Sequence, residues 1–85
     1  MATAKVKKVI DGDTIVIRKG ARIRIAGYDA PELGDYGGKA AKTRLTKMLK
    51  GKQIGISSEL GKSYGRSVRR VTLRGKPIDK LMQKK

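Results

Sequence analysis

The first third of the chain contains three short, β-branched runs separated by tight turns, a pattern that leaves few possible folds. The runs cover residues 6–10, 14–18 and 22–27. The dipeptides between them, Asp11-Gly12 and Lys19-Gly20, are typical of two-residue hairpin turns. Three short strands joined by such turns predict a β-meander.

The third run shows which side of this meander is buried. Ile23 and Ile25 alternate with Arg22 and Arg24. Successive side chains of a strand point to opposite faces, so one face is apolar and the other is basic. The sequence therefore predicts a sheet with one face on the core.

A helix is predicted over residues 39–50, after a loop over residues 28–38 that holds Pro31 and several glycines. Its apolar residues recur at i, i+4, i+7 and i+8, which places them on one stripe. They are Ala41, Leu45, Met48 and Leu49. Gly51 is a plausible stop just beyond the helix.

The rest of the chain predicts two more strands, over residues 53–57 and 67–73, with a loop over residues 61–65 between them. Ile78, Leu81 and Met82 have the spacing of a short C-terminal helix. The expected fold is mainly β with helices (α+β), an OB-fold. It is a five-stranded Greek-key barrel with a helix after the third strand. A length of 85 residues leaves room for one domain, residues 1–85.

Composition excludes several kinds of chemistry. The chain has no Cys and no His, so disulfides, thiolate metal sites, Ser-His-Asp triads, ordinary zinc sites and haem ligation are ruled out. No apolar run is long enough to span a membrane, and no signal peptide is visible, which leaves localisation unknown. The formal charge of +15 predicts a polyanionic partner, with nucleic acid first and an anionic membrane second.

Four of the seven acidic residues lie in two short motifs, DGDT at residues 11–14 and DAPE at residues 29–32. In a meander, the start of the second strand and the end of the third are neighbours, so we expect Asp13 near Asp29. Adjacent carboxylates repel each other unless a cation lies between them, and oxygen ligands favour Ca²⁺ or Mg²⁺. The alternative is that each motif only forms a turn.

The basic residues also allow two interpretations. Arg24 is either a solvated residue of the outer face or a guanidinium fork aimed at a phosphate. Residues 39–52 and 62–76 each contain six Lys or Arg and no acid, which suits contact with a phosphate backbone. The only aromatic residues are Tyr28, Tyr36 and Tyr64, which are few for a surface that stacks bases of a single strand.

Taken together and in order, these motifs resemble the staphylococcal nuclease-like (thermonuclease) family. They are DGDT at 11–14, RIAGYDAPE at 24–32, YG at 36–37 before a helix, and YGR at 64–66. The resemblance runs from about residue 5 to residue 82. It implies an OB-fold nuclease that depends on Ca²⁺ and hydrolyses phosphodiester bonds of DNA, with RNA as a second candidate substrate, to 3′-phosphate products.

The resemblance also implies roles for single residues. The catalytic residues would be Arg24, Glu32 and Arg66. The two arginines would hold the scissile phosphate, and Glu32 would act as general base or orient the attacking water. This fits the chemistry, because a phosphodiester transition state gains negative charge that guanidinium groups stabilise, and a carboxylate can accept a proton from water.

For the metal, the resemblance implies Ca²⁺ held by the side chains of Asp13 and Asp29 and by the backbone carbonyl of Ala30. Asp11 would lie in a second layer and tune the site. The absence of His is consistent with this chemistry.

Substrate binding is expected at Tyr64 and Lys62, and here the chain departs from the family. Lys62 stands where an acid is more common, and Ser63 stands where a phosphate-contacting Lys is found. Lys39 replaces a frequent Glu early in the helix. The chain also ends after the second predicted helix, so we expect a short member that lacks the usual third helix.

The leading hypothesis is a Ca²⁺-dependent nuclease, a monomer that contacts nucleic acid through the phosphate backbone and binds no membrane. The alternative is a catalytically weak, sequence-independent nucleic-acid-binding OB module. A protein-interaction module is less favoured because the charge of +15 argues against a mainly protein partner. Family members are often secreted, but the sequence does not fix the compartment.

Overall fold

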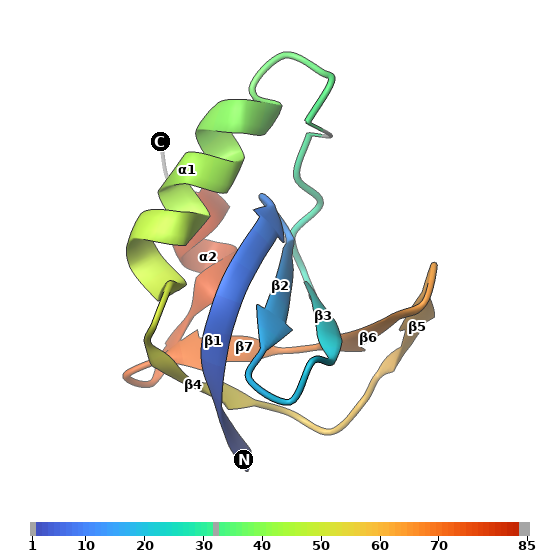
Figure 1. Ribbon diagram of the computed structural model, residues 1–85, viewed down its shortest axis with the longest axis vertical. Coiled ribbons are helices and arrows are strands. Elements are labelled where there is room, and N and C mark those ends of the chain that lie inside the picture. The colour runs from blue at the N-terminus through green and yellow to red at the C-terminus, as the bar shows by residue number, and fades with distance from the viewer. Residues whose placement is uncertain (1, 32, 84–85) are drawn as a thin grey trace.

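The computed structural model describes residues 2–31 and 33–83, in which a curled sheet carries two helices on one side (Figure 1). The strands are β1 Ala2–Asp11, β2 Thr14–Ile17, β3 Arg22–Ile25, β4 Gln53–Ile56, β5 Gly61–Ser63, β6 Arg66–Arg69, β7 Val71–Leu73 and β8 Lys76–Pro77. The helices are α1 Gly38–Leu49 and α2 Ile78–Gln83. None of the helices in this described part is long and apolar enough to cross a membrane.

The predicted meander is present. β1, β2 and β3 pair in antiparallel order, with Asp11 opposite Thr14 and Thr14 opposite Arg24. β1 begins earlier than expected, because its first residues, Ala2 to Lys5, pair with β4 on the other edge. One long strand therefore belongs to both halves of the sheet and curves between them.

The predicted fifth strand is divided in two near Arg70. β6 runs parallel to β3, whereas β7 runs antiparallel to β4. The sheet order is β5-β6-β3-β2-β1-β4-β7-β8. Since β6 and β7 follow each other in the chain, this segment links the two arms of the curled sheet. The α+β, OB-like fold class is thus confirmed.

The prediction of a loop over residues 61–65 was wrong, because this segment forms most of a hairpin. β5 pairs antiparallel with β6, and the turn consists of Tyr64 and Gly65. Both turn residues have positive φ, 51° and 77°. The strand was missed because β5 is short and polar and is followed by a glycine turn, a pattern that is also typical of a loop.

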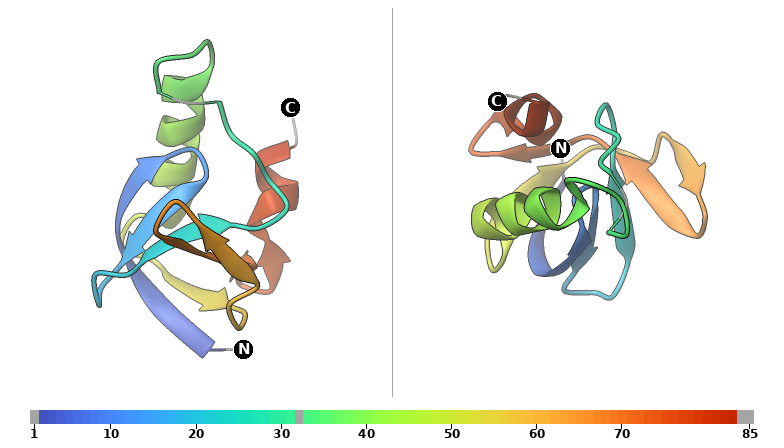
Figure 2. Two further views of the ribbon diagram at one scale, coloured as in Figure 1. Left: turned by 90° about the vertical axis from the view of Figure 1, so that its right-hand side faces the viewer. Right: turned by 90° about the horizontal axis from the view of Figure 1, so that it is seen from above.

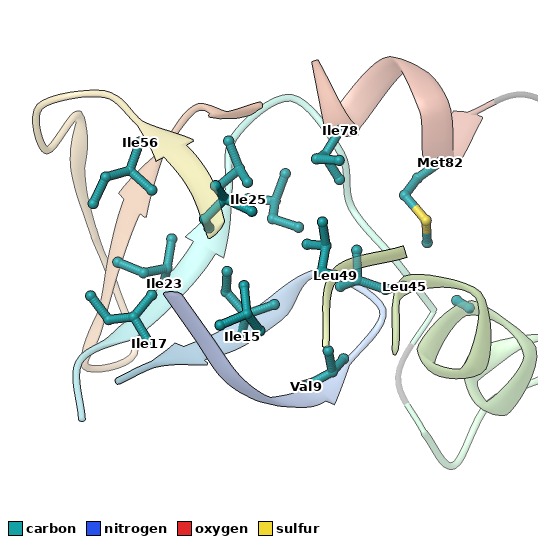
Figure 3. Close-up of a cluster of buried hydrophobic side chains, with 14 residues drawn as sticks. Val9, Ile15, Ile17, Ile23, Ile25, Leu45, Leu49, Ile56, Ile78 and Met82 are labelled. Atoms are coloured by element: carbon teal, nitrogen blue, oxygen red, sulfur yellow. The ribbon is translucent and has the colours of Figure 1, made fainter. Parts of the chain in front are cut away.

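The core lies between the sheet and the helices (Figure 3). The inward residues predicted from alternation, among them Ile23 and Ile25, are buried. The predicted helical stripe supplies Leu45 and Leu49, and Ile78 and Met82 of α2 belong to the same cluster. Met48, Leu73 and Leu81 are partly buried against it.

Gly12, in the turn between β1 and β2, is closely packed against the side chains of Ala30 and Ala41. A Cβ atom at this position would come within 2.6 Å of the Cβ of Ala41 and 2.7 Å of the Cβ of Ala30. The turn that carries Asp11 and Asp13 is therefore pressed against α1 and against the loop after β3. Glycine is required here because the neighbouring side chains leave no room for a Cβ atom.

We expect Gly12→Ala to lower the free energy of unfolding by about 1–3 kcal/mol, the usual cost of overpacking. For a domain of this size each kcal/mol shifts Tm by roughly 4–8 °C. Gly34→Ala is the matched control, because a Cβ atom there meets nothing within 4 Å. Equal urea midpoints for the two variants would contradict the account of the turn.

Candidate functional site

A cavity of about 510 Å³ opens where the β1–β2 turn, the end of β3 and the β5–β6 hairpin meet. Seven of the nine predicted site residues line it: Asp11, Asp13, Arg24, Asp29, Ala30, Tyr64 and Arg66. Pro31, Leu33, Ser63 and Val68 complete the lining. Segments that are distant in the sequence thus meet at one concave surface, as the meander predicted for Asp13 and Asp29.

The two other predicted site residues are Lys62 and Glu32. Lys62 lines a different cavity, on the other face of the β5–β6 hairpin. Its neighbour Ser63 lines the first cavity, which agrees with the alternation of side chains along a strand. Glu32 lies outside the described residues.

Among the described acids of the site, Asp13 is the most buried, with 6% of its surface exposed. Its Oδ1 accepts a hydrogen bond of 3.0 Å from the hydroxyl of Thr14. Its Oδ2 accepts one of 3.2 Å from the backbone N–H of Ala30. This carboxylate therefore ties the DAPE loop to the start of β2.

Two guanidinium groups, from different strands, face the same carboxylate. Nη2 of Arg24 lies 3.6 Å from Oδ2 of Asp13, and Nη1 of Arg66 lies 3.6 Å from Oδ1. The two arginine side chains are only 19% and 20% exposed. The alternative that Arg24 is an ordinary solvated residue therefore fails.

Arg66 is held by further contacts. Its Nε donates to the carbonyl of Ser63 at 3.0 Å, and its Nη2 donates to the Ser63 hydroxyl at 3.2 Å. Its Nη1 donates to the hydroxyl of Thr14 at 2.7 Å. The guanidinium plane is thus fixed by the tip of its own hairpin and by β2.

Arg24 also bridges two acids. Its Nη2 donates to Oδ1 of Asp29 at 3.0 Å, and its Nη1 donates to the carbonyl of Ile25 at 3.3 Å. The side chain of Asp29 is 89% exposed. Asp29 is therefore open to solvent and ligands, whereas Asp13 is enclosed.

Two further residues contact the site without having been predicted as site residues: Thr14, and Ser63, which stood out only as a departure from the family. Thr14 is nearly fully buried, and its hydroxyl links Asp13 to Arg66. The signal for Thr14 was its place beside Asp13 in the DGDT motif. No sequence pattern indicates the contact of Ser63 with Arg66, because this contact forms only within the β5–β6 hairpin, which was not predicted.

The two acids of the DGDT motif have pKa values shifted in opposite directions. Burial raises the pKa of Asp13, and its hydrogen bond with Asp11 raises it further. Burial also acts to raise the pKa of Asp11. Hydrogen bonds from Asp13 and Thr14 and the positive charge of Arg66 outweigh this effect and lower the pKa. The backbone N–H of Asp13 donates one of these bonds to Asp11, at 3.1 Å.

The donor atoms at the cavity have the right chemistry for a hard cation. Asp11, Asp13 and Asp29 supply carboxylates, Ala30 lines the same cavity, and hard cations take oxygen ligands. Within residues 2–31 and 33–83, however, no three acidic side chains lie close enough together to hold a metal ion by themselves. Ca²⁺ usually takes 6–8 oxygen ligands, so the described side chains would be part of such a set.

Known proteins resemble this chain over most of its length. The chain is 34% identical to a micrococcal nuclease of Shigella flexneri over 67 residues, which is 75% of the chain. It is 37% identical to a staphylococcal-like nuclease of Arabidopsis thaliana over 70 residues, and 33% identical to an uncharacterized endonuclease of Escherichia coli O157:H7 over 70 residues. These two matches cover 82% and 79% of the chain. No protein-family model matches.

The matches confirm the resemblance seen in the motifs, but they cover only part of each relative. The chain spans 38% of the Shigella flexneri protein, 22% of the Arabidopsis thaliana protein and 46% of the Escherichia coli protein. The relatives therefore contain much sequence with no counterpart in these 85 residues.

We expect Thr14→Val to lower the free energy of unfolding by about 1–3 kcal/mol. The substitution removes the hydroxyl that donates to the Asp13 carboxylate and accepts from the Arg66 guanidinium. Thr14→Ser is the control, since it keeps the hydroxyl. Thermal unfolding of both variants checks this. If Thr14→Ser loses as much stability as Thr14→Val, the hydroxyl link has no energetic importance.

Proposed function

We propose that this chain, which resembles nucleases named micrococcal or staphylococcal-like over most of its length, is a member of the staphylococcal nuclease-like family and hydrolyses phosphodiester bonds of nucleic acid in the cavity around Asp13. The substrate would be DNA, with RNA as a second candidate, and the product would carry a 3′-phosphate. The relatives' names support nuclease chemistry in general. The finer assignments come from the motifs.

One observation carries the proposal: Arg24 and Arg66 reach the same cavity from two strands, and the same buried carboxylate orients both. A planar guanidinium matches the oxygens of a phosphate and remains charged at all relevant pH values. Two such groups, held in place before substrate arrives, suit a transition state that gains negative charge.

For the metal we propose Ca²⁺, held by the carboxylates of Asp13 and Asp29 and by the carbonyl of Ala30, with Asp11 behind them. When bound, the ion would neutralise phosphate charge and favour attack by water. The oxygen donors and the exposure of Asp29 support this assignment. The choice of Ca²⁺ over Mg²⁺ rests on the family resemblance.

Glu32 is proposed as the general base or as the group that orients water. Its preceding residues in the DAPE motif, Ala30 and Pro31, both line the cavity. A carboxylate has the right chemistry to accept a proton from water. Tyr64, whose surface is exposed and which lines the same cavity, is proposed to contact a substrate phosphate.

We expect Arg24→Ala to slow cleavage of single-stranded DNA by about 10²–10³-fold, the usual loss when one stabilising group of a transition state is removed. Arg70→Ala is the matched control. It removes the same charge from an exposed residue that lines neither this cavity nor the one at Lys62. Gel analysis of products at low salt measures both. Equal cleavage rates for the two variants would remove Arg24 from the mechanism.

A second expectation concerns the metal and the base. Cleavage should require Ca²⁺, stop with chelator, and fall by about 10²–10⁴-fold in Glu32→Ala, the range for loss of a general base. Asp35→Ala is the control, because it removes an exposed acid that lines neither this cavity nor the one at Lys62. Cleavage that persists in chelator would contradict the metal assignment. Binding without any cleavage would favour the nucleic-acid-binding module instead.

A further inference from the structure

A second cavity, of about 470 Å³, lies on the opposite face of the β5–β6 hairpin. Four basic residues line it: Lys19, Arg22, Lys62 and Arg69. They come from the β2–β3 turn, the start of β3, and both strands of the hairpin. None of them lines the cavity around Asp13.

The hairpin has two distinct faces because its side chains alternate. Ser63 and Arg66 line the first cavity, whereas Lys62 and Ser67 line the second. At the turn, Tyr64 lines the first cavity and its neighbour Gly65 lines the second. In Figure 1 and in the right-hand view of Figure 2, the hairpin projects from the barrel on the side away from α1 and α2.

The charge balance of the two cavities differs. In the first, Arg24 and Arg66 are paired with acids. The second holds a single acid, Glu59, and among the described residues no ion pair joins it to the four bases. The second cavity therefore has an excess of positive charge that neighbouring side chains do not neutralise.

One of these bases is rigidly held. Nε of Arg69 donates to the Ser67 hydroxyl at 2.9 Å, and its Nη1 donates to the carbonyl of Ser57 at 2.9 Å. Lys19, Arg22 and Lys62 are exposed around it. A fixed guanidinium among exposed basic side chains suits an extended anion, since fixed donors lose less entropy on binding.

We propose that this second cavity binds the phosphate backbone of the same polynucleotide that enters the first, with the strand crossing the hairpin tip at Tyr64 and Gly65. The inference rests on the proposed function, to which it adds a preference for long single strands. A duplex would have to bend sharply to follow the hairpin tip, at an elastic cost that a single strand does not have.

The test compares binding of single-stranded DNA of about 4 and about 16 nucleotides, the range of site sizes on OB-folds. Affinity is measured against salt for the wild type and for the double variant Arg22→Ala/Lys62→Ala, with Ca²⁺ omitted to prevent cleavage. Lys8→Ala/Lys76→Ala is the charge-matched control, because both residues are exposed and line neither cavity. Thermal unfolding verifies that all variants are folded.

For the long strand, the double variant should bind more weakly and its log–log salt slope should fall by about 1.4, or 0.7 for each lost phosphate contact. Its affinity for the short strand should match that of the wild type. Equal loss in the control pair, or equal loss for both strand lengths, would overturn the inference but leave the proposed function standing. A wild type that binds neither strand would overturn both.

Discussion

The architecture of the site depends on one buried carboxylate, that of Asp13. It accepts hydrogen bonds from the Thr14 hydroxyl and the Ala30 backbone, and it faces the guanidinium groups of Arg24 and Arg66. These contacts join the start of β2, the end of β3, the loop that follows it, and β6. A carboxylate taken out of water is costly unless it is paired and hydrogen-bonded. The surrounding segments must therefore meet for the fold to tolerate it.

This arrangement explains how a small, strongly basic chain keeps an ordered anionic centre. The formal charge is +15, and repulsion among so many basic residues disfavours the compact state. Placing one acid between two arginines orients both toward a common cavity. The tight glycine turn at Gly12, pressed against α1, then fixes where that acid lies. Packing in the core and geometry at the site are thus coupled through a few residues.

The sequence predicted most of the fold because its signals are local. Alternation identified the inward face of β3, helical spacing identified the buried stripe of α1, and the meander implied that Asp13 and Asp29 converge. What it missed depends on long-range pairing. The division of the last strand near Arg70 follows from β6 pairing with β3 while β7 pairs with β4. The face on which Lys62 lies depends on the register of the unpredicted β5–β6 hairpin.

The central claim is that Arg24 and Arg66 act together on a phosphate in the cavity around Asp13. Nitrogen–proton correlation spectra of the arginine side chains, recorded while a short single-stranded oligonucleotide is titrated in, test it most directly. If both arginines hold the phosphate, the Nε–H signals of Arg24 and Arg66 will shift together with one dissociation constant, while that of Arg70 stays in place. Binding that leaves the signals of Arg24 and Arg66 unchanged would contradict it.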